Sequence, residues 1–194
     1  MLSVNHTEDV TAGCTRPPEL LDLPDGFLLR RRTLADADPV NAAIVRNIDH
    51  LRPWMVWADT APTLAHTQEM TRVGWQLWEE GSDYMYVLGR ADRPDSVLGM
   101  FGLHRRIGPG ALEIGYWVDL GHTGRSLATN GAAALTVAAL ALPDVERVEI
   151  HCDEANAASA AVPRKLGYRL DRVAERPASA PAETGRKLIW IKER

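Results

Sequence analysis

Along this chain the spacing of apolar residues changes between the period of a helix and the period of a strand. Apolar residues recur three or four positions apart over residues 40–51 and 63–80, which predicts two helices. Further along they alternate, in segments 84–90, 97–105 and 111–119 separated by Gly- and Pro-containing turns, which predicts an antiparallel meander. A chain that combines both periods in this way is expected to fold as an α/β domain.

The second half of the chain is expected to add helices and strands to the same domain. The helices are expected at 127–142 and 156–166, and the strands at 27–33, 145–152, 168–174 and 187–192. No internal repeat is present, which favours one domain with a mixed sheet. Residues 1–25 show neither apolar period, so we expect a flexible N-terminal tail before a single domain of residues 26–194.

Composition excludes several classes of protein. The formal net charge of −4 argues against a nucleic-acid-binding surface, which is usually basic. The two cysteines, Cys14 and Cys152, are far apart and have no further Cys or His at ligand spacing, so neither a disulfide framework nor a metal site is expected. No apolar stretch is long enough to span a membrane, and no targeting segment is evident, so we expect a cytoplasmic protein.

The loop 121–130 follows a predicted strand and opens a predicted helix. Unpaired backbone N–H groups at a helix N-terminus suit a phosphate, and Gly121 and Gly124 let the backbone approach one closely. The side chains able to add contacts are Arg125, Ser126 and Thr129. The alternative is a plain turn capped by Thr123 or Ser126. A Walker A loop is excluded, because no Gly-Lys-Ser/Thr closes the segment.

Two further segments carry polar residues at positions that could support chemistry. In the strand 112–118, Glu113 shares one face with Gly115 and Trp117, and its aliphatic surroundings make a raised pKa and a general-base role possible. The alternative is a solvated or cross-strand-paired Glu. Asn156 stands at the predicted start of a helix, where Asn is a common N-cap, and Ser159 lies one turn further on.

Taken together, these segments resemble the GNAT superfamily of N-acetyltransferases, most closely its RimJ/RimL-type branch. The likeness spans residues 26–192, and its motifs are His-Leu-Arg-Pro-Trp at 50–54, Glu-Ile-Gly-Tyr-Trp at 113–117, the loop 121–129 and Lys-Leu-Gly-Tyr at 165–168. The resemblance implies a mixed, mostly antiparallel central sheet with helices on both faces, in which a splayed pair of parallel strands holds acetyl-CoA.

The resemblance also implies which residues would bind acetyl-CoA, the acyl donor. Backbone groups at Trp117 and Val118 would pair with its pantetheine arm, and Asn156 would orient it near the sulfur. The pyrophosphate would contact Thr123, Gly124, Arg125, Ser126, Ala128 and Thr129. Thr123 and Ser126 depart from the family's usual residues, since the position of Ser126 is normally glycine.

For catalysis, the resemblance supports Glu113 as the base that deprotonates the acceptor amine, with His104, Glu149 and His151 as weaker candidates. Many relatives carry a Tyr acid seven residues after the motif Asn, but this chain has Pro163 there, so Ser159 is assigned the protonation of the thiolate. Pro163 is also expected to kink its helix. Trp54 and Trp57 are expected either to wall the acceptor site or to pack in the core.

The resulting hypothesis is an acetyl-CoA-dependent N-acetyltransferase that uses no metal and transfers acetyl to a primary amine by direct attack in a ternary complex. The acceptor would be a protein N-terminal amine or a small-molecule amine. The alternatives are a non-catalytic acyl-CoA-binding or regulatory domain, and an acyltransferase that uses a different acyl-CoA. Edge strands near the C-terminus make a homodimer plausible.

Overall fold

The computed structural model describes residues 15–194, which form one eight-stranded sheet flanked by helices. The strands lie side by side in the order β1-β2-β3-β4-β5-β6-β8-β7. Their bounds are β1 Leu20–Asp22, β2 Phe27–Arg31, β3 Asp83–Arg90, β4 Gly99–His104, β5 Ala111–Val118, β6 Arg147–Asp153, β7 Arg169–Glu175 and β8 Arg186–Glu193. All neighbouring strands pair antiparallel except β5 and β6.

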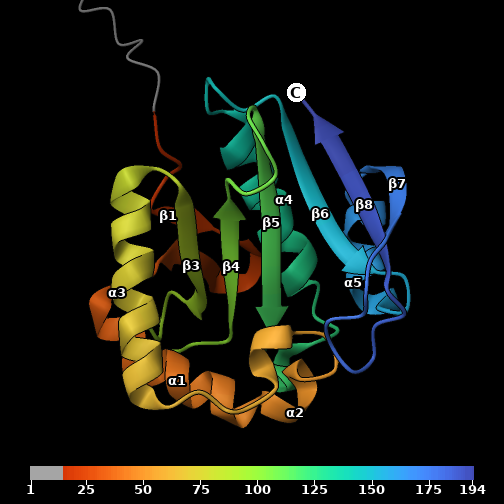
Figure 1. The fold of residues 1–194 in the computed structure, drawn as a ribbon. Helices are drawn as coiled ribbons and strands as arrows, with labels where there is room; N and C mark the ends of the chain where they lie inside the picture. Colours follow the sequence, from red (N-terminus) through yellow and green to blue (C-terminus); the bar gives the residue numbers. More distant parts are fainter. Residues whose placement is uncertain (1–14) are drawn as a thin grey trace, which may run out of the picture.

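The helices cover both faces of this sheet (Figure 1). Their bounds are α1 Ala37–Arg46, α2 Ile48–Leu51, α3 Leu64–Glu80, α4 Leu127–Leu140 and α5 Ala157–Lys165. Leu127 and Leu135 of α4 pack with core residues of β5 such as Leu112. On the opposite face, Val40 of α1 packs with Trp117 of β5. The alternation predicted for β5 is therefore confirmed, because its two sets of side chains enter two separate core clusters.

The parallel pair β5–β6 separates along its length. The two strands are paired only from Ala111–Glu113 to Arg147–Glu149, although β5 continues to Val118 and β6 to Asp153. Figure 1 shows the two strands diverging below this paired end. Beyond Glu113, therefore, one edge of β5 faces a gap in the sheet.

Two expectations about the N-terminal part of the chain need correction. Residues Leu20–Asp22 were expected within the tail, but they form β1, which pairs antiparallel with β2. The single helix expected over 40–51 is divided into α1 and α2 at Asn47, because the Asn47 side chain bonds groups outside the helix, among them Asp119. Residues 1–14, including Cys14, lie outside the described part of the chain.

Most other predicted elements are confirmed to within a few residues. The strands 84–90, 97–105 and 111–119 correspond to β3, β4 and β5, which form the expected meander. Thr63 caps α3 through its side chain, and Gly81 ends that helix in a left-handed conformation. Across residues 15–194, no helix combines the length and the apolar character needed to cross a membrane.

Candidate active site

A cavity of about 570 Å³ lies beside the gap between β5 and β6. Its walls come from the segment that joins α1 to α3, from β4, β5 and β6, from the start of α5 and from the loop between β7 and β8. The predicted site residues that line it are Trp54, Trp57, Glu113, Trp117, Asn156 and Ser159. Val118 and the loop residues 123–129 are not among its lining residues. The structure thus brings the expected acceptor and catalytic side chains together and leaves the expected pyrophosphate loop outside this cavity.

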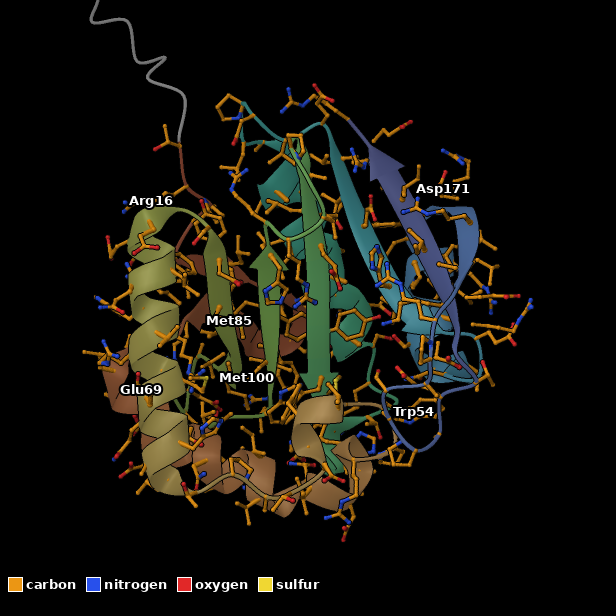
Figure 2. The ribbon with its side chains drawn as sticks, viewed as in Figure 1. Arg16, Trp54, Glu69, Met85, Met100 and Asp171 are labelled. Carbon is orange, nitrogen blue, oxygen red and sulfur yellow. The ribbon has the colours of Figure 1, made fainter. Side chains whose placement is uncertain are left out.

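The two tryptophans wall the cavity rather than fill the core. Trp57 is 48% exposed and Trp54 is half-buried. The loop between β7 and β8 closes against this segment, because the backbone N–H of Ala182 donates to the carbonyl of Pro53 over 3.0 Å. Figure 2 shows Trp54 beside that loop. The position of both side chains at the cavity supports the acceptor-site alternative.

The loop after β5 ends in an open helix N-terminus. Ser126 is the N-cap residue of α4, but its side chain makes no capping hydrogen bond. The Thr123 hydroxyl does not cap α4 either, because it donates to the carbonyl of Leu120 over 2.9 Å. Gly124 has a φ of 73°, and no atom lies within 4 Å of the Cβ it lacks. The capped-turn alternative is therefore wrong, and the first N–H groups of α4 remain available for an anion.

Asp119 fixes this loop to the end of α1, a role that the sequence analysis missed. Its carboxylate accepts from Asn47 Nδ2 at 2.8 Å, from Arg46 Nη2 at 3.0 Å and from the backbone of Gly121 at 3.0 Å. Asn47 in turn accepts the N–H of Leu120 through Oδ1 at 2.8 Å. Asp119 stands at the end of a buried strand and directly before the glycine-containing loop, and this position could have indicated its role from the sequence.

Glu113 lies where the expectation placed it, but its electrostatics differ. Burial opposes its ionisation, yet the hydrogen bonds from Arg106 and the nearby imidazole of His151 outweigh burial and hold the pKa of Glu113 below its ordinary value. Arg106 donates to both carboxylate oxygens, from Nε and from Nη2, each over 2.8 Å. The expectation of a raised pKa is therefore wrong, because a cation from the neighbouring hairpin loop, unnoticed in the sequence, pairs with this carboxylate.

Asn156 and Ser159 meet at the start of α5. Asn156 caps this helix, since its Oδ1 accepts the N–H of Ser159 over 3.0 Å. The carbonyl of Ser159 would normally accept the N–H of residue 163, but Pro163 has none. The hydroxyl of Tyr116 donates to that carbonyl instead, over 3.2 Å, and lies 3.3 Å from the Ser159 hydroxyl. Tyr116 was not predicted as a site residue, and the missing N–H at Pro163 was the signal for a donor from elsewhere.

The weaker base candidates occupy different places. His104 and His151 line the cavity, whereas Glu149 does not. Glu149 is engaged on both oxygens, by Arg147 Nε at 2.8 Å and by His151 Nε2 at 2.6 Å. Burial opposes its ionisation, but these two partners outweigh it and lower the pKa of Glu149. Glu149 therefore contacts a residue of the cavity wall, His151, without lining the cavity itself.

The charged side chains that line the cavity balance one another, although the chain as a whole has a formal net charge of −4. As many cationic as anionic side chains line it, the anions being Glu113, Asp153 and Glu183 and the cations Arg32, Arg106 and Lys187. Asp153 and Glu183 are occupied by backbone N–H groups of the loop between β7 and β8. Among residues 15–194, no group of three or more His, Cys, Asp or Glu residues is arranged to hold a metal ion.

Fold and site together define an α/β protein with a cavity beside the gap between two parallel strands, lined by groups able to transfer protons. The acetyltransferase (GNAT) domain family matches residues 27–169, and the chain belongs to this family. No curated protein sequence matches the chain significantly.

Solved structures of acetyltransferases share this fold over almost the whole chain. RimL, the ribosomal L7/L12 alpha-N-protein acetyltransferase in complex with coenzyme A, aligns with a TM-score of 0.82 at 19% identity, covering 90% of this chain and 98% of that chain. MccE, the microcin C7 self-immunity acetyltransferase in complex with acetyl-CoA and AMP, aligns with a TM-score of 0.81 at 16% identity, covering 93% and 99%. RimJ of Mycobacterium smegmatis, in complex with a CoA disulfide, aligns with a TM-score of 0.76 at 19% identity, covering 93% and 88%. The expected fold class and family are confirmed.

Proposed function

We propose that this protein is an acetyl-CoA-dependent N-acetyltransferase that acetylates a primary amine by direct attack in a ternary complex. The observation that carries the proposal is the cavity at the β5–β6 gap, where Trp117 of β5 meets Asn156 and Ser159 at the start of α5. RimL and RimJ, which share the fold, are acetyltransferases solved with coenzyme A or its disulfide, and RimL acts on the N-terminal amine of a ribosomal protein. A protein N-terminus is therefore the first acceptor to test, followed by small-molecule amines.

The residues present fit the acyl donor in two ways. Beyond Glu113, the edge of β5 is unpaired with β6, so its backbone at Trp117 and Val118 can pair with an amide-containing arm. The uncapped N-terminus of α4 offers N–H groups to a pyrophosphate, and Arg125 adds a positive charge there. Acetyl-CoA supplies an acetyl group that is activated as a thioester.

The hydroxyl pair at the start of α5 would serve the leaving side of the reaction. Ser159 is the candidate proton donor to the thiolate, and Tyr116 holds it by bonding to its carbonyl. Burial raises the pKa of Tyr116 far above its ordinary value, so its phenol stays protonated and acts as a hydrogen-bond donor. Asn156 holds the same turn from the other side.

On the acceptor side an ammonium group must lose a proton before it can attack, because its pKa is about 8 for an N-terminus and about 10.4 for a lysine. The sequence analysis assigned this deprotonation to Glu113. With a lowered pKa and both oxygens bound to Arg106, Glu113 is a weak base at neutral pH. A different group is therefore needed to accept the proton.

The activity is tested by thiol release from acetyl-CoA in the presence of a panel of N-terminal peptides and amines, with mass spectrometry of the acetylated product. The expected result is turnover with at least one amine and a loss of kcat of about tenfold or more in Ser159→Ala. A protein that binds CoA with no acceptor turned over would contradict the proposal and favour a non-catalytic acyl-CoA-binding domain. Faster turnover with a longer acyl-CoA would show that the donor is not acetyl-CoA, while the protein would still be an N-acyltransferase.

The position of the donor is tested independently of turnover through Cys152, which lines the cavity near Ser159. With CoA disulfide, the Cys152 thiolate would attack one sulfur, forming a protein–CoA disulfide and releasing one CoA thiolate. Burial raises the pKa of the Cys152 thiol, so the exchange should be slow and should accelerate at alkaline pH.

Mass spectrometry of the intact protein should show one added CoA in Cys14→Ser, which has Cys152 as its single cysteine. The double variant Cys14→Ser/Cys152→Ser is the control and should show none. A Cys14→Ser protein that stays unmodified would place the thiol of CoA away from this cavity.

A further inference from the structure

Asp83 and His104 form a pair of side chains whose contacting atoms are buried below the cavity. Nδ1 of His104 lies 2.5 Å from Oδ1 of Asp83. Both atoms are inaccessible to solvent, and within residues 15–194 neither makes a hydrogen bond of ordinary geometry, to the other or to a third group. A carboxylate this close favours a proton on Nδ1, and with that tautomer Nε2 of the ring is an acceptor.

Two glycines determine where this free nitrogen lies. Gly102 of β4 and Gly115 of β5 are directly opposite one another. A Cβ added at Gly102 would lie 2.6 Å from Nε2 of His104, and one at Gly115 would lie 3.2 Å from it. The imidazole therefore occupies the space left by the two missing side chains, and larger residues at either position would displace it.

This position is at the start of the gap in the sheet. The last β5–β6 pair is Glu113 with Glu149, and Gly115 lies two residues beyond it on β5. His104 lines the cavity together with Gly115 and Trp117. Its Nε2 therefore lies where the gap begins, which is where the thioester of a bound acyl donor is expected. An acceptor held by Trp54 and Trp57 would enter on the same face of the sheet.

We propose that His104, oriented by Asp83, is the group that takes the proton from the acceptor amine. The inference rests on the proposed acetyltransferase function and assigns the base of that same site. Nε2 of His104 accepts a proton from the ammonium group, and the neutral amine forms a C–N bond to the carbonyl carbon of the thioester. The C–S bond then breaks, the thiolate takes a proton from the Ser159 hydroxyl, the second amine proton restores that hydroxyl, and His104 returns its proton to solvent through the cavity.

Other charged groups around His104 would affect its protonation. Glu113 is its direct cross-strand neighbour on β5, and Asp83 faces it from β3. The other ionisable side chains that line the cavity are Arg32, His66, Arg106, Tyr116, His151, Cys152, Asp153, Glu183 and Lys187. Because Arg106 neutralises Glu113, the carboxylate in contact with the imidazole is that of Asp83.

The test compares His104→Ala, Asp83→Asn and Glu113→Gln with the wild type, and uses His50→Ala as a matched control on α2, outside the cavity lining. His104→Ala should lower kcat about 100-fold while the affinity for acetyl-CoA and the melting temperature stay close to wild type. The wild-type pH profile of kcat/KM should persist in Glu113→Gln, whereas in His104→Ala kcat/KM should fall below the pKa of the amine itself, about 8 for an N-terminus, because only the free amine then reacts. Added imidazole should restore a part of the activity of His104→Ala and none of that of Asp83→Asn.

A readout without turnover comes from the Nδ1 proton of His104. In the wild type its NMR signal should lie far downfield because of the contact with Asp83, and it should be absent in Asp83→Asn. His104→Gln, which retains a polar side chain above the two glycines, is a second variant if His104→Ala folds poorly.

The inference is overturned if His104→Ala and His104→Gln retain wild-type kcat and the same pH profile while Glu113→Gln loses activity. Wild-type protein without turnover on any amine would instead overturn the proposed function, and this inference with it.

Discussion

Ser126 occupies a backbone conformation that side chains rarely adopt. Its φ is 60° and its ψ is 10°, in the left-handed region, directly before the first residue of α4. A residue with a Cβ is disfavoured there by roughly 1–2 kcal/mol. Glycine is usual at this position in the family that the loop resembles. The backbone of this chain keeps the conformation that suits glycine, and Ser126 is strained in it.

Ser126→Gly should stabilise the protein by about 0.5–1 kcal/mol, since the strain removed exceeds the larger chain entropy of glycine. Urea unfolding measures this change. Ser126→Ala is the control, because it keeps the Cβ and removes only the hydroxyl, and it should not stabilise. A Ser126→Gly variant less stable than wild type would show that the conformation carries no strain.

Asp119 is the residue whose charge should matter most for stability against acid. Burial opposes its ionisation, but hydrogen bonds from Asn47, His122 and Arg46 outweigh burial and hold its pKa far below the ordinary range. The unfolded chain, with a pKa of about 3.9, binds a proton before the folded protein does, so this contribution is present above pH 4 and is lost as the pH falls further.

Asp119→Asn should lower the free energy of unfolding by about 1–2 kcal/mol at pH 7. The difference from wild type should shrink as the pH falls from about 5 towards 3, because the unfolded wild-type chain then binds a proton at Asp119 that the folded protein does not bind. Denaturant titrations at several pH values measure it. A difference that stays constant over this range would mean that packing, rather than charge, accounts for the role of Asp119.

At the scale of elements, α5 and β5 are joined by the hydrogen bond that a proline makes possible. Pro163 removes the N–H that would bond to the Ser159 carbonyl, and the hydroxyl of Tyr116 takes its place. Tyr116 is also held by stacking on Phe101, with ring centroids 5.6 Å apart. The start of α5 is therefore positioned by β5 instead of by its own helical turn.

Pro163→Ala restores the N–H, which should compete with Tyr116 for the Ser159 carbonyl. Tyr116→Phe should then cost about 1 kcal/mol in the wild type and close to nothing in Pro163→Ala. A double-mutant cycle of unfolding free energies gives this coupling. Equal costs of Tyr116→Phe in both backgrounds would show that the phenol bonds elsewhere.

At the scale of the whole molecule, the cavity exists only because segments far apart in sequence meet. Residues 54–57 and the loop between β7 and β8 form its outer wall, and β4 and β5 form its floor. The groups expected to hold the acyl donor lie along the β5–β6 gap and at α4. Acceptor binding and donor binding should therefore respond to different mutations.

Trp57→Ala should raise KM for the acceptor about tenfold, equivalent to roughly 1.4 kcal/mol, with the dissociation constant of acetyl-CoA unchanged. Trp75→Ala is the matched control, because Trp75 packs beneath Arg31, with 3.9 Å between the guanidinium carbon and the ring centre, and lines no part of the cavity. Steady-state kinetics and calorimetry separate the two effects. Unchanged acceptor KM in Trp57→Ala would show that this wall does not touch the acceptor.

Local patterns in the sequence were sufficient to predict most of the helices and strands and which of their residues share a face. Alternation in β5 placed Glu113 and Trp117 on one side because successive residues of a strand point to opposite faces. Apolar spacing likewise gave α3 and α4 within two residues of their ends. The short β1 and the break at Asn47 were missed, because both depend on partners that are distant in the chain.

The sequence by itself determined the fold class, the family and most of the helices and strands. Only the tertiary structure decided the electrostatics within that site. Arg106 reaches Glu113 across a hairpin and lowers its pKa, while Asp83 meets His104 through strand pairing. Periodicity follows from the local geometry of the backbone, but the protonation of a side chain depends on the burial and charge of neighbours that only folding brings near.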